Sequence, residues 1–249
     1  MIIYSVYDAV ASITLDRPEK RNALNDELIA ALKQGLERAA GDESVRVVMI
    51  SGAGNDFCSG ADLSALQKIA QASVADNAED ARSLLELFVQ IRQMRVPVVA
   101  AVKGRALAGG CGLASACDLV LASESARFGY PEVKIGFVPA MVLAILRRNV
   151  SEKRAFELLT RGEEFDAARA KEIGLVNQVF SDQSFEIEVD MYLRRFSEVS
   201  STAVALTKSL LYQVDGLAFL EALETGADVN VIARMTEDCQ AGIARFLKK

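Results

Sequence analysis

The sequence predicts an α/β fold in which parallel strands alternate with helices, followed by a region of helices alone. Three short runs rich in Val, Ile and Leu, at residues 96–102, 118–122 and 176–180, are separated by segments with helical spacing of apolar residues. Parallel strands need such crossover connections, and this alternation is typical of α/β proteins. After about residue 185 only an amphipathic helical pattern remains. We expect this last part to dock on the first part or on a neighbouring subunit.

The N-terminal elements follow the same reasoning. Residues 1–15 alternate in part between apolar and polar and end at DRP (16–18), which predicts one strand that runs into a turn. Asn25 is expected to cap a helix whose apolar face is formed by Leu28, Ile29, Leu32, Leu36 and Ala39. VRVVMIS (45–51) predicts a buried strand. Residues 79–95 predict a helix with an apolar face of Leu84, Leu87, Phe88 and Ile91.

Composition excludes several classes of protein. The chain has 249 residues, which suits one large domain or a domain with a small appendage, and its net charge of −6 argues against nucleic-acid binding. We see no secretion signal, and the longest apolar stretch is too short to span a bilayer, so we expect no membrane partner. Four cysteines without a CxxC pair suggest a reducing cytoplasm. The absence of histidine excludes Ser-His-Asp catalysis and any His-ligated metal within the chain.

Two glycine-containing segments precede predicted helix starts. In ALAGGCGLASACD (106–118), Gly109 and Gly110 would let a ligand oxygen approach the unpaired N–H groups of a helix N-terminus. In FCSGADL (57–63), Ala61 follows a glycine and Asp62 could cap the next helix. Taken alone, each segment is equally a tightly packed turn. Together they could aim one backbone N–H each at a single oxygen, which is the minimum for an oxyanion hole.

The order and spacing of several motifs resemble the crotonase (enoyl-CoA hydratase/isomerase) superfamily. They are LDRPEKRNALN, FCSGADL, AAVKGRALAGGCGLASACDLVLASESARFGYPEVKIGFVPA, the ALTKSLL helix and the FLKK end. The resemblance implies a spiral of ββα turns over residues 1–195. It also implies a helical oligomerisation region over residues 196–249 that forms homotrimers, which often pair into hexamers.

The same resemblance implies an acyl-CoA thioester as substrate, with coenzyme A as part of the substrate and no separate cofactor or metal. The backbone N–H groups of Ala61 and Gly109 would hold the enolate-like thioester oxygen, and Glu132, in YPE, would be the general acid or base. The residues that match coenzyme A contacts of relatives are Lys20, Arg21, Ala23, Ser59, Ala61, Asp62, Leu63 and Lys249.

The sequence departs from the two-acid hydratases at Gly112, where those relatives carry a first glutamate. We expect a hydratase for a branched enoyl-CoA, because IGFVPA (135–140) is similar to hydratases of 3-methylglutaconyl-CoA. A single-glutamate Δ3,Δ2-enoyl-CoA isomerase and a CoA-binding homologue without turnover stay open. A dehalogenase is a poor match, because Ala140 stands where its aspartate nucleophile belongs.

Five further positions allow two interpretations each. A substrate with a distal carboxylate could pair with Arg82, Arg92 or Lys68, which are otherwise solvated charges on helices. Cys111 is expected to be a small packing residue rather than a reactive thiol. Tyr130 could donate a hydrogen bond in the pocket or simply pack.

Overall fold

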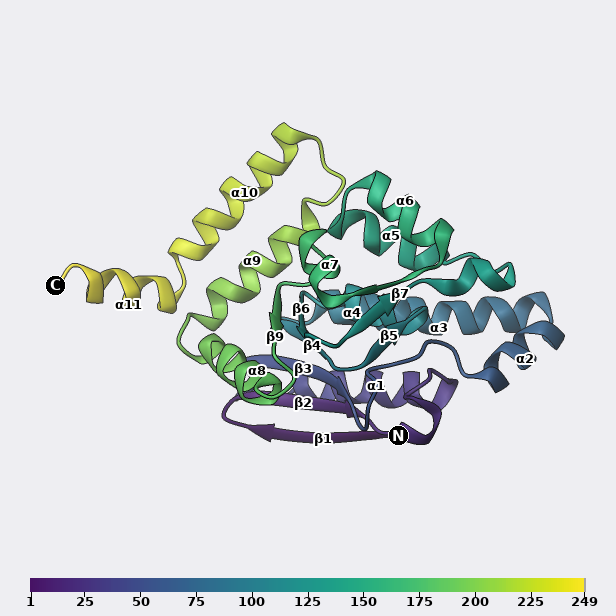
Figure 1. The fold of residues 1–249 in the computed structure, drawn as a ribbon. Helices are drawn as coiled ribbons and strands as arrows, with labels where there is room; N and C mark the ends of the chain where they lie inside the picture. Colours follow the sequence, from purple (N-terminus) through teal and green to yellow (C-terminus); the bar gives the residue numbers. More distant parts are fainter. Residues whose placement is uncertain (249) are drawn as a thin grey trace.

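The computed structural model describes residues 1–248, without the side chains of residues 63, 64 and 66. Its main sheet has the strand order β1-β2-β3-β4-β6-β9. These strands are β1 (Ile2–Tyr7), β2 (Val10–Leu15), β3 (Val47–Gly52), β4 (Val98–Val102), β6 (Leu119–Ser123) and β9 (Gln178–Phe180). From β2 onward all neighbours are parallel, as the alternation of strands and helices predicted (Figure 1).

The N-terminal segment is a hairpin, so the prediction of one strand was wrong. Strands β1 and β2 pair antiparallel, with Ile2 opposite Leu15, and the chain reverses at Asp8 and Ala9. Both turn residues have positive φ angles, 46° and 65°. Neither residue is glycine, and the Asn-Gly or Asp-Gly pair that usually marks a hairpin turn is absent. The sequence therefore contains no sign of a turn between the two strands.

A smaller second sheet contains β5 (Arg105–Leu107), β7 (Arg127–Gly129) and β8 (Glu164–Asp166). Two successive turns of the chain each contribute one strand to the large sheet, then one to the small sheet, and then a helix. Thus β4 and β5 lead into α4 (Gly109–Ala116), and β6 and β7 lead into η2 (Pro131–Ile135) and α5 (Ala140–Asn149). Isolated bridges from Leu24 to Ala61 and from Cys58 to Ala106 continue the small sheet. This is the ββα spiral that the resemblance implied.

The first two long helices start at hydrogen-bonded caps. The Asn25 side chain accepts the Leu28 N–H at the start of α1 (Asp26–Ala40), as predicted, and every expected apolar residue of that helix is buried. Helix α3 (Val74–Gln93) begins at Ser73, earlier than predicted, because Ser73 and Asp76 form a capping box. The short helix η1 (Pro18–Lys20) precedes α1, and α2 (Leu63–Gln71) lies between α1 and α3 in the chain.

Helices cover both faces of the large sheet. On one face, the side chains of α1, α3 and α4 form the main core with alternate residues of β2, β3 and β4. On the other face, Phe185, Val189 and Leu193 of α8 (Phe185–Arg194) pack on Val47, Val99 and Leu121. The remaining elements of the core are α6 (Glu152–Arg161), α7 (Ala167–Glu172) and η3 (Arg195–Ser197). Burial of alternate strand residues on both faces explains the continuous apolar runs in the sequence.

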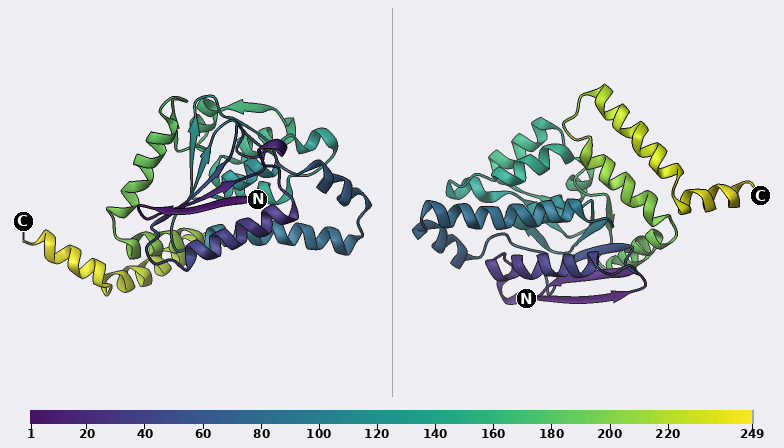
Figure 2. Two further views of the ribbon diagram at one scale, coloured as in Figure 1. Left: turned by 90° about the horizontal axis from the view of Figure 1, so that it is seen from below. Right: turned by 180° about the vertical axis from the view of Figure 1, so that it is seen from behind.

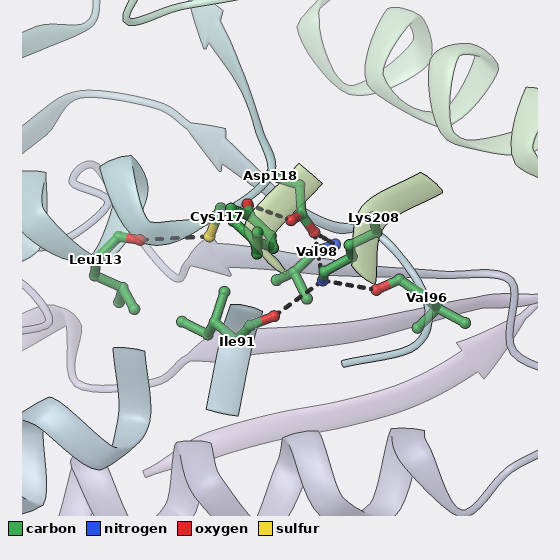
Figure 3. Close-up of polar contacts among 8 residues, drawn as sticks. Ile91, Val96, Val98, Leu113, Cys117, Asp118 and Lys208 are labelled. Carbon is green, nitrogen blue, oxygen red and sulfur yellow. Dashed lines mark hydrogen bonds and ion pairs between the residues drawn. The ribbon is translucent and has the colours of Figure 1, made fainter. Parts of the chain in front are cut away.

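Helix α9 (Ser201–Gln213) is anchored to the core by the buried side chain of Lys208 (Figure 3). Its Nζ donates to the carbonyl oxygens of Ile91 and Val96 at 2.9 and 3.1 Å and pairs with Asp118 Oδ2 at 2.6 Å. Asp118 also accepts hydrogen bonds from Tyr212 Oη and the Val98 N–H. A buried charge is tolerated only with such partners.

The last two helices, α10 (Phe219–Arg234) and α11 (Glu237–Phe246), project away from the sheets (Figures 1 and 2). Neither helix has a buried residue. The exposed apolar side chains of these helices and of the link between them include Phe219, Leu220, Leu223, Val231, Ile232, Met235, Ile243 and Phe246. Among the described helices of the chain, none combines the length and the apolar character that crossing a membrane requires.

Candidate active site

A cavity of about 1090 Å³ opens between the start of α1, helices α2 and α3, the start of α4 and the segment from η2 to α5. Its walls are mostly apolar, with Ile29, Ala65, Ile69, Leu84, Leu85, Phe137, Val138, Met141 and Val142. Ser59, Ala61, Gly109 and Glu132 line the same cavity. The structure therefore brings together the two predicted amide donors and the predicted acid from three separate turns of the spiral.

The segment that carries Ala61 is fixed by backbone hydrogen bonds on both sides of that residue. Leu24 N–H donates to Gly60 O at 2.7 Å, and Asp62 N–H donates to Leu24 O at 2.9 Å. The Ala61 N–H has no acceptor among the described residues, and the residue is exposed to the cavity. A donor held in place without a partner is available to a ligand oxygen.

Helix α4 begins at Gly109, whose N–H belongs to the unpaired first turn. The residue before it, Ala108, has φ 49° and ψ −126°, a conformation that residues with a side chain rarely adopt. A Cβ built on Gly60 would lie 3.4 Å from Gly109 N. The chain segments bearing the Ala61 and Gly109 amides are therefore in contact at Gly60.

Glu132 lies in η2, directly after Pro131, which follows the fully buried Tyr130. Its Oε2 is buried and has no hydrogen-bond partner within the described part of the chain. Burial raises the pKa of Glu132 above the ordinary value of a glutamate. A carboxyl group without a committed partner and with a raised pKa is suited to exchange protons with a ligand in the cavity.

A buried cluster supports the start of η2 and explains two side chains that the sequence left open. Tyr130 Oη and Ser115 Oγ share a hydrogen bond of 2.9 Å, and Ser115 Oγ donates to Cys111 O at 2.6 Å. Tyr130 therefore packs and bonds inside the core, outside the cavity lining. Burial raises the pKa of the Cys111 thiol to about 12, so it is a protonated packing residue, as expected.

Gly112, in the middle of α4, faces side chains that leave no room for one of its own. A Cβ at this position would lie 2.6 Å from Val142 Cγ2 and 3.6 Å from Phe88 Cζ. Val142 lines the cavity. Helix α4 carries no acid, so Glu132 is the predicted acid that lines the cavity together with Ala61 and Gly109.

The predicted coenzyme A contacts fall into three groups. Ser59 and Ala61 line the cavity, and Lys20 and Arg21 are exposed near η1. Ala23 and Asp62 are buried. The side chain of Leu63 and all of Lys249 lie outside the described residues.

Asp62 supports the site from beneath the surface instead of facing the cavity. Arg17 Nη2 pairs with Asp62 Oδ2 at 2.8 Å, and Arg17 Nη1 donates to Ala23 O at 2.6 Å. These bonds join the segment before α1 to the segment that carries Ala61. From the sequence, Asp62 was a possible helix cap and a candidate coenzyme A contact. The bond to Arg17 could not be predicted, because that residue lies 45 positions away.

The three basic candidates for a distal carboxylate have different surroundings. Lys68 Nζ pairs with Asp26 Oδ2 at 2.6 Å, and Arg92 lies 4.6 Å from the centre of the Tyr212 ring, away from the cavity. Arg82 lines the cavity and makes no salt bridge with any described residue. Of the three, Arg82 is placed to meet a ligand.

Comparisons with known proteins agree with this geometry. The family described as "Enoyl-CoA hydratase/isomerase" matches residues 5–249. The chain is 36% identical over 250 residues to the 2,3-dehydroadipyl-CoA hydratase of Escherichia coli, covering 100% of this chain and 96% of that protein. It is 40% identical over 240 residues to a Thermus thermophilus protein provisionally named an enoyl-CoA hydratase, covering 96% and 95% of the two chains.

Solved structures show the same architecture. The enoyl-CoA hydratase of Mycobacterium smegmatis superimposes with a TM-score of 0.94 at 31% identity, over 99% of this chain and 96% of that one. Human enoyl Coenzyme A hydratase domain-containing protein 3 superimposes with a TM-score of 0.93 at 29% identity, over 99% and 97%. The expected crotonase-type α/β fold with a C-terminal helical region is confirmed.

Proposed function

Because the chain belongs to the enoyl-CoA hydratase/isomerase family, we propose that it is a hydratase-type lyase that adds water across the α,β double bond of an enoyl-CoA. The observation that carries this proposal is the cavity that collects the Ala61 and Gly109 amides and the Glu132 carboxyl group. Hydratase is also the activity named for the relatives above. The substrate supplies coenzyme A, and the proposed reaction uses no other cofactor.

Hydration of the double bond divides into two proton movements that one carboxylate can serve. As a water oxygen attaches to Cβ, the Glu132 carboxylate takes a proton from that water, and the electron pair of the double bond moves toward the thioester oxygen. The Ala61 and Gly109 N–H groups stabilise the resulting enolate. Glu132 then returns the proton to Cα. Each such backbone donor typically lowers the barrier by about 3–4 kcal/mol.

A second function, isomerisation of a 3-enoyl-CoA to a 2-enoyl-CoA, is favoured by the packing at Gly112. Because Val142 fills the space beside Gly112, α4 contributes no side chain that could hold the attacking water. A single carboxylate can still move a proton from Cα to Cγ, with the same two amides holding the enolate oxygen. The two activities therefore share every residue named here.

One assay separates the two activities. Purified protein is incubated with crotonyl-CoA and, separately, with 3-hexenoyl-CoA in water enriched in ¹⁸O, and the products are analysed by mass spectrometry. A hydratase incorporates one solvent oxygen at Cβ, whereas an isomerase yields 2-hexenoyl-CoA without solvent oxygen. Absence of both products, together with binding of the thioester, would leave the CoA-binding homologue without turnover as the correct description.

The acyl group of the proposed substrate is branched and carries a distal carboxylate, as in 3-methylglutaconyl-CoA. Support comes from the charges around the cavity. Two acids at the cavity have cationic partners: Asp26 is paired with Lys68, and Glu86 is paired with Lys33 at 2.8 Å. The pKa of the third acid, Asp80, is raised, mainly by burial and to a smaller extent by the negative charge of Asp26. Arg82 remains as a cationic group without a salt bridge to any described residue, on the α3 wall of the cavity that also carries Asp80 and Glu86. Arg is well suited to bind a carboxylate with two hydrogen bonds.

Two thioesters of equal chain length test this role of Arg82. We expect the wild type to prefer 2,3-dehydroadipyl-CoA to 2-hexenoyl-CoA, and Arg82→Ala to remove that preference by raising KM for the carboxylated thioester alone. Arg92→Ala is the matched control on the same helix, since Arg92 lies away from the cavity. If Arg82→Ala lowered kcat/KM equally for both thioesters, Arg82 would instead bind the coenzyme A moiety that the two substrates share.

Assembly and location complete the proposal. We propose that residues 196–249 form the interface of a homotrimer, or of a hexamer built from two trimers, because α10 and α11 expose contiguous apolar side chains. Light scattering of the purified chain measures the assembly mass directly. A cytoplasmic location stays a prediction.

A further inference from the structure

Ala108 is held in a backbone conformation that disfavours any side chain. Its φ of 49° is positive, and its ψ of −126° lies outside the left-handed helical region that Asn and Asp tolerate. Glycine adopts this conformation without a steric penalty. The chain nevertheless has alanine here, at the residue before the Gly109 amide. Strain of this kind persists only where the surroundings fix it, and it is concentrated at functional sites.

The surroundings of Ala108 do fix this conformation. Its N–H donates to Gly129 O at 2.8 Å, and its carbonyl oxygen accepts the Gly112 N–H at 2.9 Å. Gly60 lies next to the Ala108 methyl group. A Cβ built on Gly60 would lie only 2.7 Å from Ala108 Cβ. The methyl group therefore occupies space that Gly60 leaves open. Gly60 itself has a φ of 95° and allows this close approach.

The methyl group lies close to both chain segments that carry the proposed donors. Three covalent bonds separate Ala108 Cβ from Gly109 N, so these atoms lie within about 4 Å of one another. Gly60, which the methyl group approaches from the other side, directly precedes Ala61. Ala108 also lines the cavity. A carbonyl oxygen accepting from both amides would have the Ala108 methyl group as its neighbour.

We infer that Ala108 is a specificity-determining residue, whose methyl group limits the size of the substituent at the carbon next to the thioester carbonyl. This inference rests on the proposed function, since it requires the thioester oxygen to lie between the Ala61 and Gly109 amides. The carbonyl carbon has two neighbours, the sulfur, which is the same in every substrate, and Cα, which varies. The methyl group therefore discriminates against enoyl thioesters with a branch at Cα.

The test compares crotonyl-CoA with 2-methylcrotonyl-CoA in the wild type and in Ala108→Gly. We expect the wild type to have a higher kcat/KM for crotonyl-CoA than for 2-methylcrotonyl-CoA. In the variant, this ratio should fall about tenfold, because one carbon group in an apolar pocket provides discrimination of about this size. We also expect the thermal unfolding midpoint to rise by about 2–4 °C, because glycine takes this conformation without strain.

Ala9→Gly is the matched control, since Ala9 also has a positive φ, 65°, but sits in the β1–β2 turn and does not line the cavity. It should raise the midpoint and leave the substrate ratio unchanged. An active wild type whose ratio is the same in Ala108→Gly would overturn the inference while leaving the proposed function intact. A wild type inactive on both thioesters, with no product in the ¹⁸O assay, would count against the proposed function itself. The midpoints would still show whether Ala108 is strained.

Discussion

Val142 occupies the space that a side chain at Gly112 would need, with its Cγ2 2.6 Å from the position of a Cβ there. Gly112→Ala should therefore destabilise the fold by about 1–3 kcal/mol through overpacking, despite the better helix propensity of alanine. Chemical denaturation measures the change. In Gly112→Ala combined with Val142→Ala, the loss should be smaller than the sum of the two single losses, because the new methyl group fills part of the space that Val142 leaves.

Gly226→Ala is the helical control for this experiment. Gly226 is also within a helix, α10, and within the single chain a Cβ there meets nothing within 4 Å. The substitution should stabilise the chain by up to about 1 kcal/mol. Equal effects at residues 112 and 226 would contradict the packing argument.

Glu132→Gln should abolish most of the catalysis while keeping the shape of the site. Glutamine cannot exchange the proton, so we expect kcat to fall by about 10²–10⁴-fold with little change in KM. Steady-state kinetics with crotonyl-CoA measures both constants. Wild-type kcat in the variant would show that another group carries the proton.

The same substitution should make stability less dependent on pH. Burial raises the folded-state pKa of Glu132, so the wild type loses stability as the pH rises from the ordinary glutamate pKa through this raised value. The stability of Glu132→Gln relative to wild type should increase over that interval and be smallest at acid pH. Denaturation curves at a series of pH values test this trend.

Glu163→Gln is the control of opposite sign. A hydrogen bond from Arg161 lowers the pKa of Glu163, so its contribution is present above the ordinary glutamate pKa and is lost as the pH falls. The same trend in both variants would show that the slope belongs to the whole protein and not to Glu132.

Lys208→Met should destabilise the chain strongly, because it leaves Asp118 buried without its cation. Removing one partner of a buried ion pair costs about 3–5 kcal/mol, and the Lys208 side chain is only 7% exposed. Lys33→Met, which breaks the pair with the largely exposed Glu86, should have a much smaller effect. Similar losses in the two variants, measured by urea denaturation, would contradict the anchoring role of Lys208.

Gly162→Ala should lower kcat through the position of Glu132. Gly162 ends α6 with φ 62°, and a Cβ there would press on Val133 Cγ2 at 3.1 Å and Pro131 Cα at 3.4 Å, on either side of Glu132. We expect kcat to fall several-fold and its pH dependence to shift. Gly216→Ala is the control. Gly216 also has a positive φ, 94°, but a Cβ there meets nothing within 4 Å, so the substitution should alter stability without changing the pH profile of kcat.

The pattern of residues predicted most of the elements, because local signals such as the Asn25 cap and the β-branched runs act within a few positions. The β1–β2 turn was missed since Asp8 and Ala9 adopt positive φ without glycine. At the site, the motifs placed Ala61, Gly109 and Glu132 at one cavity. They could not show that Val142 closes the space beside Gly112 or that Ala108 is strained. Both facts depend on contacts between distant turns of the spiral.

The burial of three cysteines leaves the protein with one natural attachment point for a chemical probe. Cys58, Cys111 and Cys117 are buried, and burial raises the pKa of each thiol, so maleimides should not reach or react with them in the folded state. Cys239, on α11, is partly exposed. A fluorophore attached there would report on the surroundings of the C-terminal helices during turnover, without any engineered cysteine.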